Sequence, residues 1–153
     1  MKKIFFPGSF NPFTAGHADI LERILLLTDK VTVGIGMNIE KQGSKEAAEK
    51  NADAIKTYIS KKGLEDRVEV LVYSGLTGEV AKKRGADCLV RGVRTSADYE
   101  YEYSLAAANR DAFGIETILI PSDPALSFIS STMIRDLIKH NRENLTKKYL
   151  PKF

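Results

Sequence analysis

The chain has 153 residues, of which 43% are hydrophobic and 28% are charged, and its net charge is +3. This length suits one domain with its own core, and the composition excludes collagen-like, low-complexity and disulfide-rich proteins. The small positive charge argues against a nucleic-acid partner, because nucleic-acid binders carry a larger, clustered basic surplus. No segment is long and apolar enough to span a bilayer. We therefore expect a single domain over residues 1–153, with neither a nucleic-acid nor a membrane partner.

Cys88 is the only cysteine in the chain. A lone cysteine cannot form an internal disulfide, which favours a reducing compartment and indicates the cytoplasm. Cys88 begins an apolar run, so we favour a buried residue that packs like a small hydrophobic side chain over a nucleophile. Residues 1–6 carry too short an apolar stretch for a signal peptide and are typical of a first strand.

Short apolar or β-branched runs alternate with longer amphipathic segments along the chain. This pattern predicts strands over residues 3–6, 31–35, 68–73, 88–90 and 117–120, and helices over 17–27, 44–61 and 76–84. A fourth helix is expected to be capped by Ser96 and to run to about residue 113, and a fifth to be capped by Ser130 or Ser131. Five strands that alternate with helices indicate an α/β fold with a doubly wound, five-stranded parallel sheet. In such sheets ligands bind beyond the carboxyl ends of the strands, so the segments that follow the strands are the candidates for a site.

The segment after the first strand, residues 7–17, contains glycines, prolines and small hydroxyl residues before a helix. Glycine lets a phosphate approach the backbone, and the free N–H groups of a helix start bind anions. His17 stands on the first turn of that helix, where it can donate a hydrogen bond to a phosphate. The alternative, given equal weight, is a histidine that caps its own helix.

Polar segments also follow later strands. Arg91 and Arg94 flank Gly92 after the fourth strand, and this position favours bidentate phosphate binding over a solvated surface pair. Residues 127–135 after the fifth strand bring hydroxyl groups to a helix start, which is either a second anion-binding terminus or ordinary capping. Lys41 lies in a polar segment that we expect to be a mobile loop, where it either closes over phosphates or stays solvent-exposed.

Other chemistry is excluded by the motifs that the chain lacks. There is no Gly-x-x-x-x-Gly-Lys-Ser/Thr sequence, which excludes a P-loop of that form. Residues 34–36 lack the third glycine of a dinucleotide-binding fingerprint. His17, His140 and Cys88 do not make a zinc site, so we expect no metal held by protein side chains.

The motifs Thr14-Ala15-Gly16-His17 and Ile129-Ser130-Ser131-Thr132-Met133-Ile134-Arg135 resemble the markers of the nucleotidyltransferase superfamily, which implies its Rossmann-like fold. Within that superfamily, residues 7–12, 91–102 and 127–131 are similar to the bacterial phosphopantetheine adenylyltransferases, and the similarity covers nearly the whole chain. The resemblance implies transfer of AMP from ATP to 4′-phosphopantetheine by direct in-line attack, giving dephospho-coenzyme A and pyrophosphate in coenzyme A biosynthesis. Catalysis then depends mostly on positioning and charge stabilisation.

The resemblance also implies roles for individual residues. His17 would stabilise the transition state at the α-phosphate of ATP. The acceptor would contact Ser9, Lys41, Thr77 and Arg91. ATP would contact Ser9, Phe10, His17, Gly92, Val93, Arg94, Glu102, Leu126, Ser127, Phe128, Ile129, Ser130, Ser131 and Thr132. The family further implies Mg²⁺ that accompanies ATP and is held largely by phosphates and water, coenzyme A as a feedback ligand, and a homohexamer.

Two positions depart from the usual pattern of this family. Leu126 stands where an aromatic residue is usual, and residues 42–46 lack the usual proline-containing segment. Alternative functions are a nicotinamide mononucleotide adenylyltransferase or a cytidylyltransferase of the same superfamily, or a non-catalytic nucleotide sensor on the same fold. The presence of His17, Arg91 and Ser131 together favours an enzyme. Subunit contacts through Tyr99, Tyr101 and Tyr103 are also expected.

Overall fold

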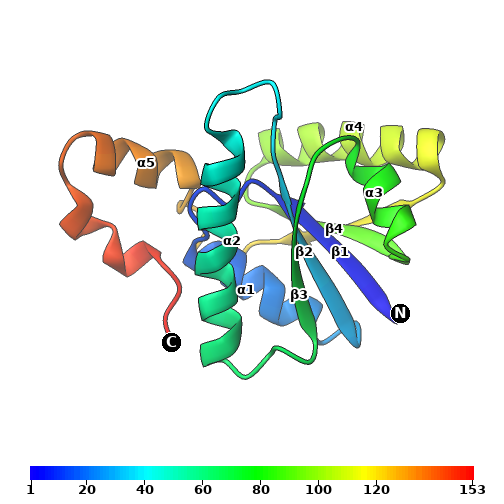
Figure 1. Ribbon diagram of the computed structural model, residues 1–153, viewed down its shortest axis with the longest axis horizontal. Helices are drawn as coiled ribbons and strands as arrows, with labels where there is room; N and C mark the ends of the chain where they lie inside the picture. The colour runs from blue at the N-terminus through cyan, green and yellow to red at the C-terminus, as the bar shows by residue number, and fades with distance from the viewer.

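The computed structural model describes residues 1–153, which form one five-stranded parallel sheet flanked by helices on both faces (Figure 1). The elements in chain order are β1 (Lys3–Gly8), α1 (Ala15–Ile24), β2 (Lys30–Gly36), α2 (Ser44–Lys61), β3 (Val68–Tyr73), α3 (Thr77–Lys83), β4 (Cys88–Val93), α4 (Ser96–Phe113), β5 (Glu116–Pro121) and α5 (Ser131–Lys139), followed by short 3₁₀ turns at Glu143–Leu145 and Lys147–Tyr149. The strand order is β3-β2-β1-β4-β5, and every neighbouring pair is parallel. The predicted doubly wound, Rossmann-like sheet is confirmed.

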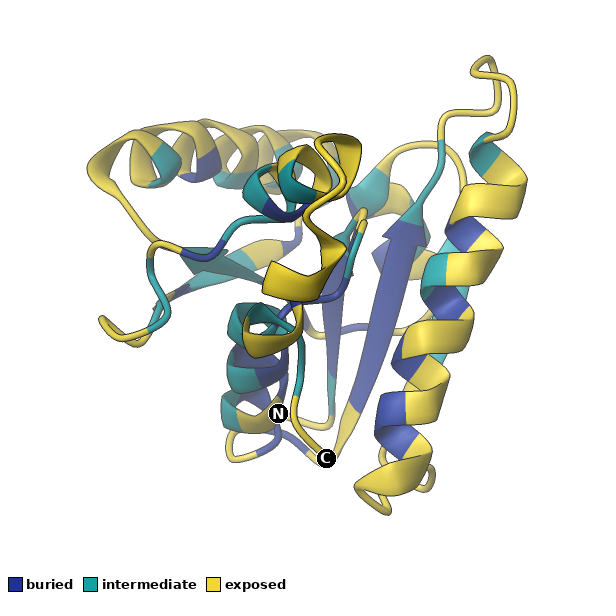
Figure 2. Ribbon diagram, turned by 90° about the vertical axis from the view of Figure 1, so that its left-hand side faces the viewer, coloured by how far each residue is buried: buried dark blue, intermediate teal, exposed yellow.

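Side chains that alternate along each strand build two cores, one on each face of the sheet. In β1, Ile4 and Phe6 pack in the larger core with α1 and α2, whereas Phe5 packs with Tyr73 and Leu89 on the face of α3 and α4. Burial on both faces explains why the strands have nearly continuous apolar sequences. Figure 2 shows buried residues along the strands and on the inner side of α2, while α4 is exposed along almost its whole length.

The strand order reverses between β1 and β4, and these two strands separate toward their carboxyl ends. β1 pairs with β2 over its full length, from Lys3 to Gly8. It pairs with β4 only at Ile4 and Phe5, opposite Cys88 and Leu89. Beyond that point the strands diverge, which opens the crevice that parallel sheets of this type use for ligands.

Four of the five strands are longer than predicted, and the extensions of β1 and β4 reach the crevice. β4 continues to Val93 rather than Val90, so Arg91 and Gly92 belong to the strand instead of following it. β1 likewise continues to Gly8 rather than Phe6. A strand that is predicted from a run of apolar residues stops where that run is interrupted. The pairing with the neighbouring strand continues through the interrupting residues, so the strand in the structure is longer.

Hydroxyl side chains set the starts of three helices. α1 begins at Ala15, two residues before the predicted start, because Thr14 caps it. α4 is capped by Thr95 rather than by Ser96, and α5 is capped by Ser130, one of the two caps predicted. No helix of the protein combines the length and the apolar character needed to cross a bilayer.

After α5 the chain turns back toward α2 (Figure 1). The ring of Tyr149 packs edge-on against Phe128, with 5.8 Å between the ring centroids. The ring of Phe153 packs against Tyr58 of α2 at 5.9 Å. These two aromatic contacts fix the carboxyl-terminal residues on the rest of the protein.

Candidate active site

The amino terminus of α1 is closed by two reciprocal hydrogen bonds between Thr14 and His17. The Thr14 hydroxyl accepts the backbone N–H of His17 at 3.2 Å, and the imidazole Nδ1 of His17 accepts the backbone N–H of Thr14 at 3.0 Å. Because a backbone N–H can only donate, Nδ1 must be the unprotonated nitrogen of a neutral ring, and Nε2 carries the proton. His17 therefore caps its helix, and its Nε2–H remains available as a donor.

His17 is neutral over the physiological pH range. Burial, and to a smaller extent the positive charges of Arg91 and Arg94, lower the pKa of the imidazole from 6.5 to about 4. The ring is held between Phe10, which meets it edge-on at a centroid distance of 5.0 Å, and Phe13, which is stacked at 5.8 Å with an interplanar angle of 14°. These contacts fix the imidazole as a neutral hydrogen-bond donor.

Phe10 holds an unusual backbone conformation next to this ring. Its φ of 49° lies in the left-handed region, which is rare for a bulky residue. Its side chain is buried and packs edge-on against Phe6 and Phe13. Backbone strain of this kind is found where the surrounding packing holds a functional loop in one shape.

A cavity of about 290 Å³ lies at the crevice between β1 and β4. Many of the residues predicted to bind substrate line it together: Ser9, Phe10, His17, Arg91, Gly92, Arg94, Glu102, Ile129, Ser130, Ser131 and Thr132. The first turns of α1 and α5 both contribute to its wall, so two helix amino termini face the same space. Their free N–H groups and dipoles favour a bound anion.

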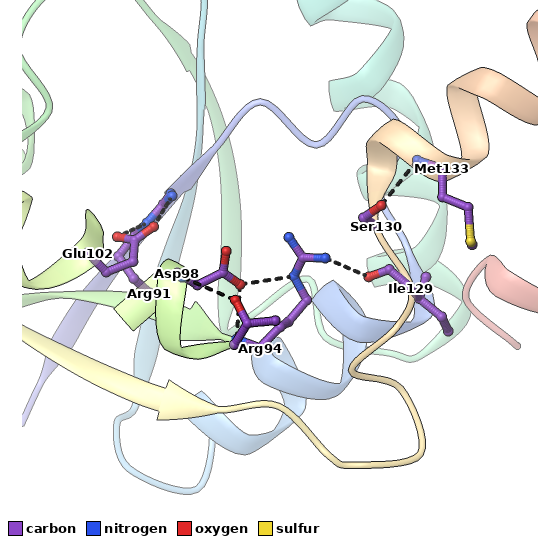
Figure 3. A network of polar contacts seen from close by, with 8 residues as sticks. Arg91, Arg94, Asp98, Glu102, Ile129, Ser130 and Met133 are labelled. Atoms are coloured by element: carbon purple, nitrogen blue, oxygen red, sulfur yellow. Dashed lines mark hydrogen bonds and ion pairs between the residues drawn. The ribbon is translucent and has the colours of Figure 1, made fainter. Parts of the chain in front are cut away.

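The start of α5 is tied to the loop between β1 and α1. Ser130 caps the helix by accepting the backbone N–H of Met133 at 3.1 Å (Figure 3). Ser131 donates to the carbonyl of Pro12 at 2.9 Å, and Arg135 donates to the carbonyl of Asn11 at 2.6 Å. These bonds hold the two helix starts in a fixed relation across the first cavity.

Arg94 connects two walls of the first cavity (Figure 3). Its Nε lies 3.4 Å from a carboxylate oxygen of Asp98, and its Nη1 donates to the carbonyl of Ile129 at 3.4 Å. Both distances are long, and the arginine side chain is 39% exposed. Its guanidinium is therefore free to turn toward an anion in the cavity.

Arg91 is held more tightly (Figure 3). Its Nε and Nη2 donate to the two carboxylate oxygens of Glu102 at 2.9 and 2.7 Å, and its Nη1 donates to the carbonyl of Pro7 at 2.6 Å. Burial alone lowers the pKa of the Arg91 guanidinium, but the hydrogen bonds and charge of Glu102 outweigh it and raise that pKa. Arg91 is thus a permanent cation in a fixed orientation.

A second cavity of about 580 Å³ adjoins the first on the face of the sheet covered by α3 and α4. The two cavities share Pro7, Gly8, Ser9, Arg91 and Glu102. Much of the second wall is apolar, from Tyr73, Leu76, Leu89, Leu105 and Phe113, while Thr77, which was predicted to contact the acceptor, and Asn109 add polar groups. This shape and lining suit an elongated ligand with a charged end at Arg91.

Five predicted site residues line neither cavity: Lys41, Val93, Leu126, Ser127 and Phe128. Lys41 is exposed in the turn that precedes α2. Phe128 is 60% exposed, and its ring packs edge-on against Tyr149. In this structure the segment 126–132 therefore reaches the first cavity only from Ile129 onward.

Sequence reasoning missed several residues that line the cavities. Arg135 lines the first cavity. Its place as the last residue of the motif that begins at Ile129 could have indicated this. Asp98 lines it too, four residues from its partner Arg94. In the second cavity, Leu105 and Asn109 lie one helical turn apart on α4, a spacing that could have indicated a common face.

Comparisons with known proteins agree with this architecture. The cytidylyltransferase-like family model matches residues 5–137. A phosphopantetheine adenylyltransferase of Porphyromonas gingivalis is 43% identical over 145 residues, which is 94% of this chain and 92% of that protein. A phosphopantetheine adenylyltransferase of Bacteroides fragilis is 38% identical, over 99% of this chain and 97% of that protein.

Among solved structures, a bifunctional NMN adenylyltransferase/ADP ribose pyrophosphatase from Francisella tularensis aligns with a TM-score of 0.64 at 16% identity. The alignment covers 97% of this chain and 44% of that chain. At this identity the likeness establishes a common fold.

Proposed function

The chain belongs to the cytidylyltransferase-like family and, within it, to the phosphopantetheine adenylyltransferases, and we propose on this basis that it transfers AMP from ATP to 4′-phosphopantetheine. The products are dephospho-coenzyme A and pyrophosphate, a step of coenzyme A biosynthesis. The observation that carries this assignment is identity of 38% and 43% to enzymes of that name over nearly the whole chain. Two cavities of different character that meet at Arg91 suit an enzyme with two substrates of different chemistry.

ATP occupies the first cavity in this proposal. The triphosphate lies against the amino termini of α1 and α5, where Ser130, Ser131 and Thr132 line the wall. Arg94 turns from its long contacts with Asp98 and Ile129 to the phosphates. Helix termini and arginine are the groups that proteins use most for phosphate oxygens.

4′-Phosphopantetheine occupies the second cavity. Its phosphate lies at the end shared by both cavities, near Ser9 and the Arg91 guanidinium. Its pantetheine arm extends along the apolar wall toward Leu105 and Phe113, with Thr77 beside it. This orientation brings the acceptor phosphate next to the space assigned to the triphosphate.

The reaction is an in-line displacement at phosphorus. An oxygen of the acceptor phosphate attacks the α-phosphorus of ATP, the bond to the bridging oxygen breaks, and pyrophosphate leaves with that electron pair. The Nε2–H of His17 donates a hydrogen bond to an α-phosphate oxygen as charge builds on it. Since the imidazole is neutral, it acts as a hydrogen-bond donor and not as a general acid with a proton to spare.

Mg²⁺ accompanies the nucleotide in this proposal. No three His, Cys, Asp or Glu side chains cluster in a way that could hold a metal ion. The carboxylates beside the first cavity, Asp98 and Glu102, are both paired with arginines. An ion carried by phosphate and water ligands would fit beside these residues, and it would supply charge neutralisation for the leaving pyrophosphate.

Three further properties are part of the proposal. Coenzyme A, which contains the chemical groups of the product, would bind across both cavities and act as a feedback ligand. The chain assembles as a homohexamer, and the exposed Tyr99, Tyr101 and Tyr103 on α4 provide subunit contacts. The protein works in the cytoplasm, where its single cysteine stays reduced.

The decisive experiment measures pyrophosphate release from ATP and Mg²⁺ with 4′-phosphopantetheine or nicotinamide mononucleotide as the acceptor. We expect release with 4′-phosphopantetheine alone. Release only with the mononucleotide would keep the role of His17 and overturn the acceptor. No release with either acceptor, in protein shown to be folded, would favour a non-catalytic nucleotide sensor.

A further inference from the structure

Glu102 is the only buried residue of α4, a helix of 18 residues. Its side chain is 6% exposed, and it is one of the few buried ionisable groups in the protein. Burying a carboxylate is costly unless it is paired and hydrogen-bonded. The pairing with Arg91 meets this requirement, so the two residues depend on each other for their positions.

The hydrogen bonds of Arg91 define which part of its guanidinium a ligand can reach. A guanidinium has five N–H donors. One on Nε and one on Nη2 bind Glu102, and one on Nη1 binds the carbonyl of Pro7. One N–H group remains on each terminal nitrogen, and N–H groups of arginine are strong donors to phosphate oxygens.

We infer that Glu102 is a positioning residue for Arg91 and acts on the acceptor phosphate through it, instead of binding the ribose or adenine of ATP. The inference rests on the proposed function, since it assumes that the acceptor carries the phosphate bound by Arg91. Glu102 and Pro7 hold three N–H groups of the guanidinium. Arg91 lines both cavities, so its two remaining N–H groups are the donors that a ligand there can use. Both oxygens of Glu102 are committed to this task.

Arg94, the other arginine of the site, is held less tightly than Arg91, which supports the positioning role of Glu102. Asp98 contacts Arg94 through one oxygen at 3.4 Å, and both side chains are about one-third exposed, at 31% and 39%. Glu102 contacts Arg91 through two oxygens at 2.7 and 2.9 Å, and its own side chain is 6% exposed while that of Arg91 is 30% exposed. Arg94 can therefore adapt to its ligand, whereas Arg91 is held ready before the ligand arrives.

The test is Glu102→Gln, measured by the KM for each substrate. The amide NH₂ of glutamine would face one of the N–H donors of Arg91, which breaks the double hydrogen bond while the side chain keeps its size. We expect the KM for 4′-phosphopantetheine to rise about tenfold, with the KM for ATP changed less than about twofold. A rise in the KM for ATP with an unchanged acceptor KM would overturn the inference and return Glu102 to the nucleotide.

Glu100→Gln is the matched control, because Glu100 lies on the same helix, is exposed and lines neither cavity. It should leave both KM values as in the wild type. If wild-type protein releases no pyrophosphate with 4′-phosphopantetheine, the proposed function fails. If the wild type is active and Glu102→Gln has the wild-type acceptor KM, only the present inference fails.

A measurement on the wild-type protein covers the case in which the variant does not fold. The Nε–H signal of Arg91 in a ¹H–¹⁵N spectrum, identified by its loss in Arg91→Lys, reports directly on the bond to Glu102. Addition of a non-hydrolysable ATP analogue should leave this signal in place, and addition of 4′-phosphopantetheine should shift it. Loss of the signal on adding the analogue would show that Glu102 turns to the nucleotide and would contradict the inference.

Discussion

The backbone N–H of Thr14 donates to the imidazole Nδ1 of His17 at 3.0 Å, and the hydroxyl of Thr14 accepts the backbone N–H of His17 at 3.2 Å. One pair of residues thus starts α1 and selects the tautomer of the histidine. The same arrangement satisfies two N–H groups that a helix start leaves free, and it directs a fixed donor at the first cavity. In the proposed mechanism, helix stability and catalysis therefore depend on the same two side chains.

Replacement of His17 by Ala should lower turnover by about a hundredfold to a thousandfold, because one preorganised donor to the transition state is lost. ATP should still bind, since the helix termini and Arg94 remain. Steady-state turnover and ATP affinity by calorimetry measure the two effects. His17→Asn is the control for the helix cap, because its side-chain oxygen can still accept the N–H of Thr14. Wild-type turnover in His17→Ala would contradict the assigned role.

The depressed pKa of His17 predicts a pH dependence of stability. The folded imidazole has a pKa of about 4 and the ordinary value is 6.5, so the unfolded chain binds more protons between these values. Stability from this group is complete above pH 6.5 and falls as the pH drops toward 4, by about 3 kcal/mol in total. Denaturant unfolding at both ends of the range should show this loss in the wild type and not in His17→Asn. An equal loss in both proteins would assign it to other groups.

Arg91→Met should raise the acceptor KM and lower stability, for two separate reasons. The phosphate loses its bidentate partner, and Glu102 is left buried without a counterion, which costs about 3–5 kcal/mol. The double variant Arg91→Met/Glu102→Leu replaces the ion pair by apolar side chains and should regain most of that stability without regaining the acceptor KM. Thermal unfolding and steady-state kinetics of both variants test this separation. Recovery of both properties in the double variant would mean that Arg91 serves only to neutralise Glu102.

The sequence predicted most of the fold because each helix and strand has a distinct periodicity. It predicted β3 and α2 to the residue and the end of α4 at Phe113, since glycines and loops bound them. It missed the carboxyl ends of β1 and β4, because Gly8, Arg91 and Gly92 interrupt the apolar pattern there.

The motifs predicted the residues of the candidate site, but they did not predict which residues those side chains hydrogen-bond to. The bonds of Arg91 to Glu102 and to Pro7 join residues that are 11 and 84 positions apart, and only the tertiary structure brings them together. The apolar wall of the second cavity is equally hidden, because Leu89 and Phe113 are typical core residues in sequence. Hydrophobic pattern indicates burial but does not distinguish a packed core from the wall of a binding cavity.

Thr117 of β5 provides a last test, in which stability should rise. Its hydroxyl oxygen is buried and has no hydrogen-bond partner in the protein. Removing such a group relieves a desolvation cost, so Thr117→Val should stabilise the protein by about 1 kcal/mol and raise the melting temperature. Thr32→Val is the matched control on β2, because the fully buried Thr32 hydroxyl donates to Glu69 at 2.7 Å and its loss should destabilise. A lower melting temperature for Thr117→Val would show that its hydroxyl is hydrogen-bonded in solution, to ordered water in the second cavity, which Thr117 also lines.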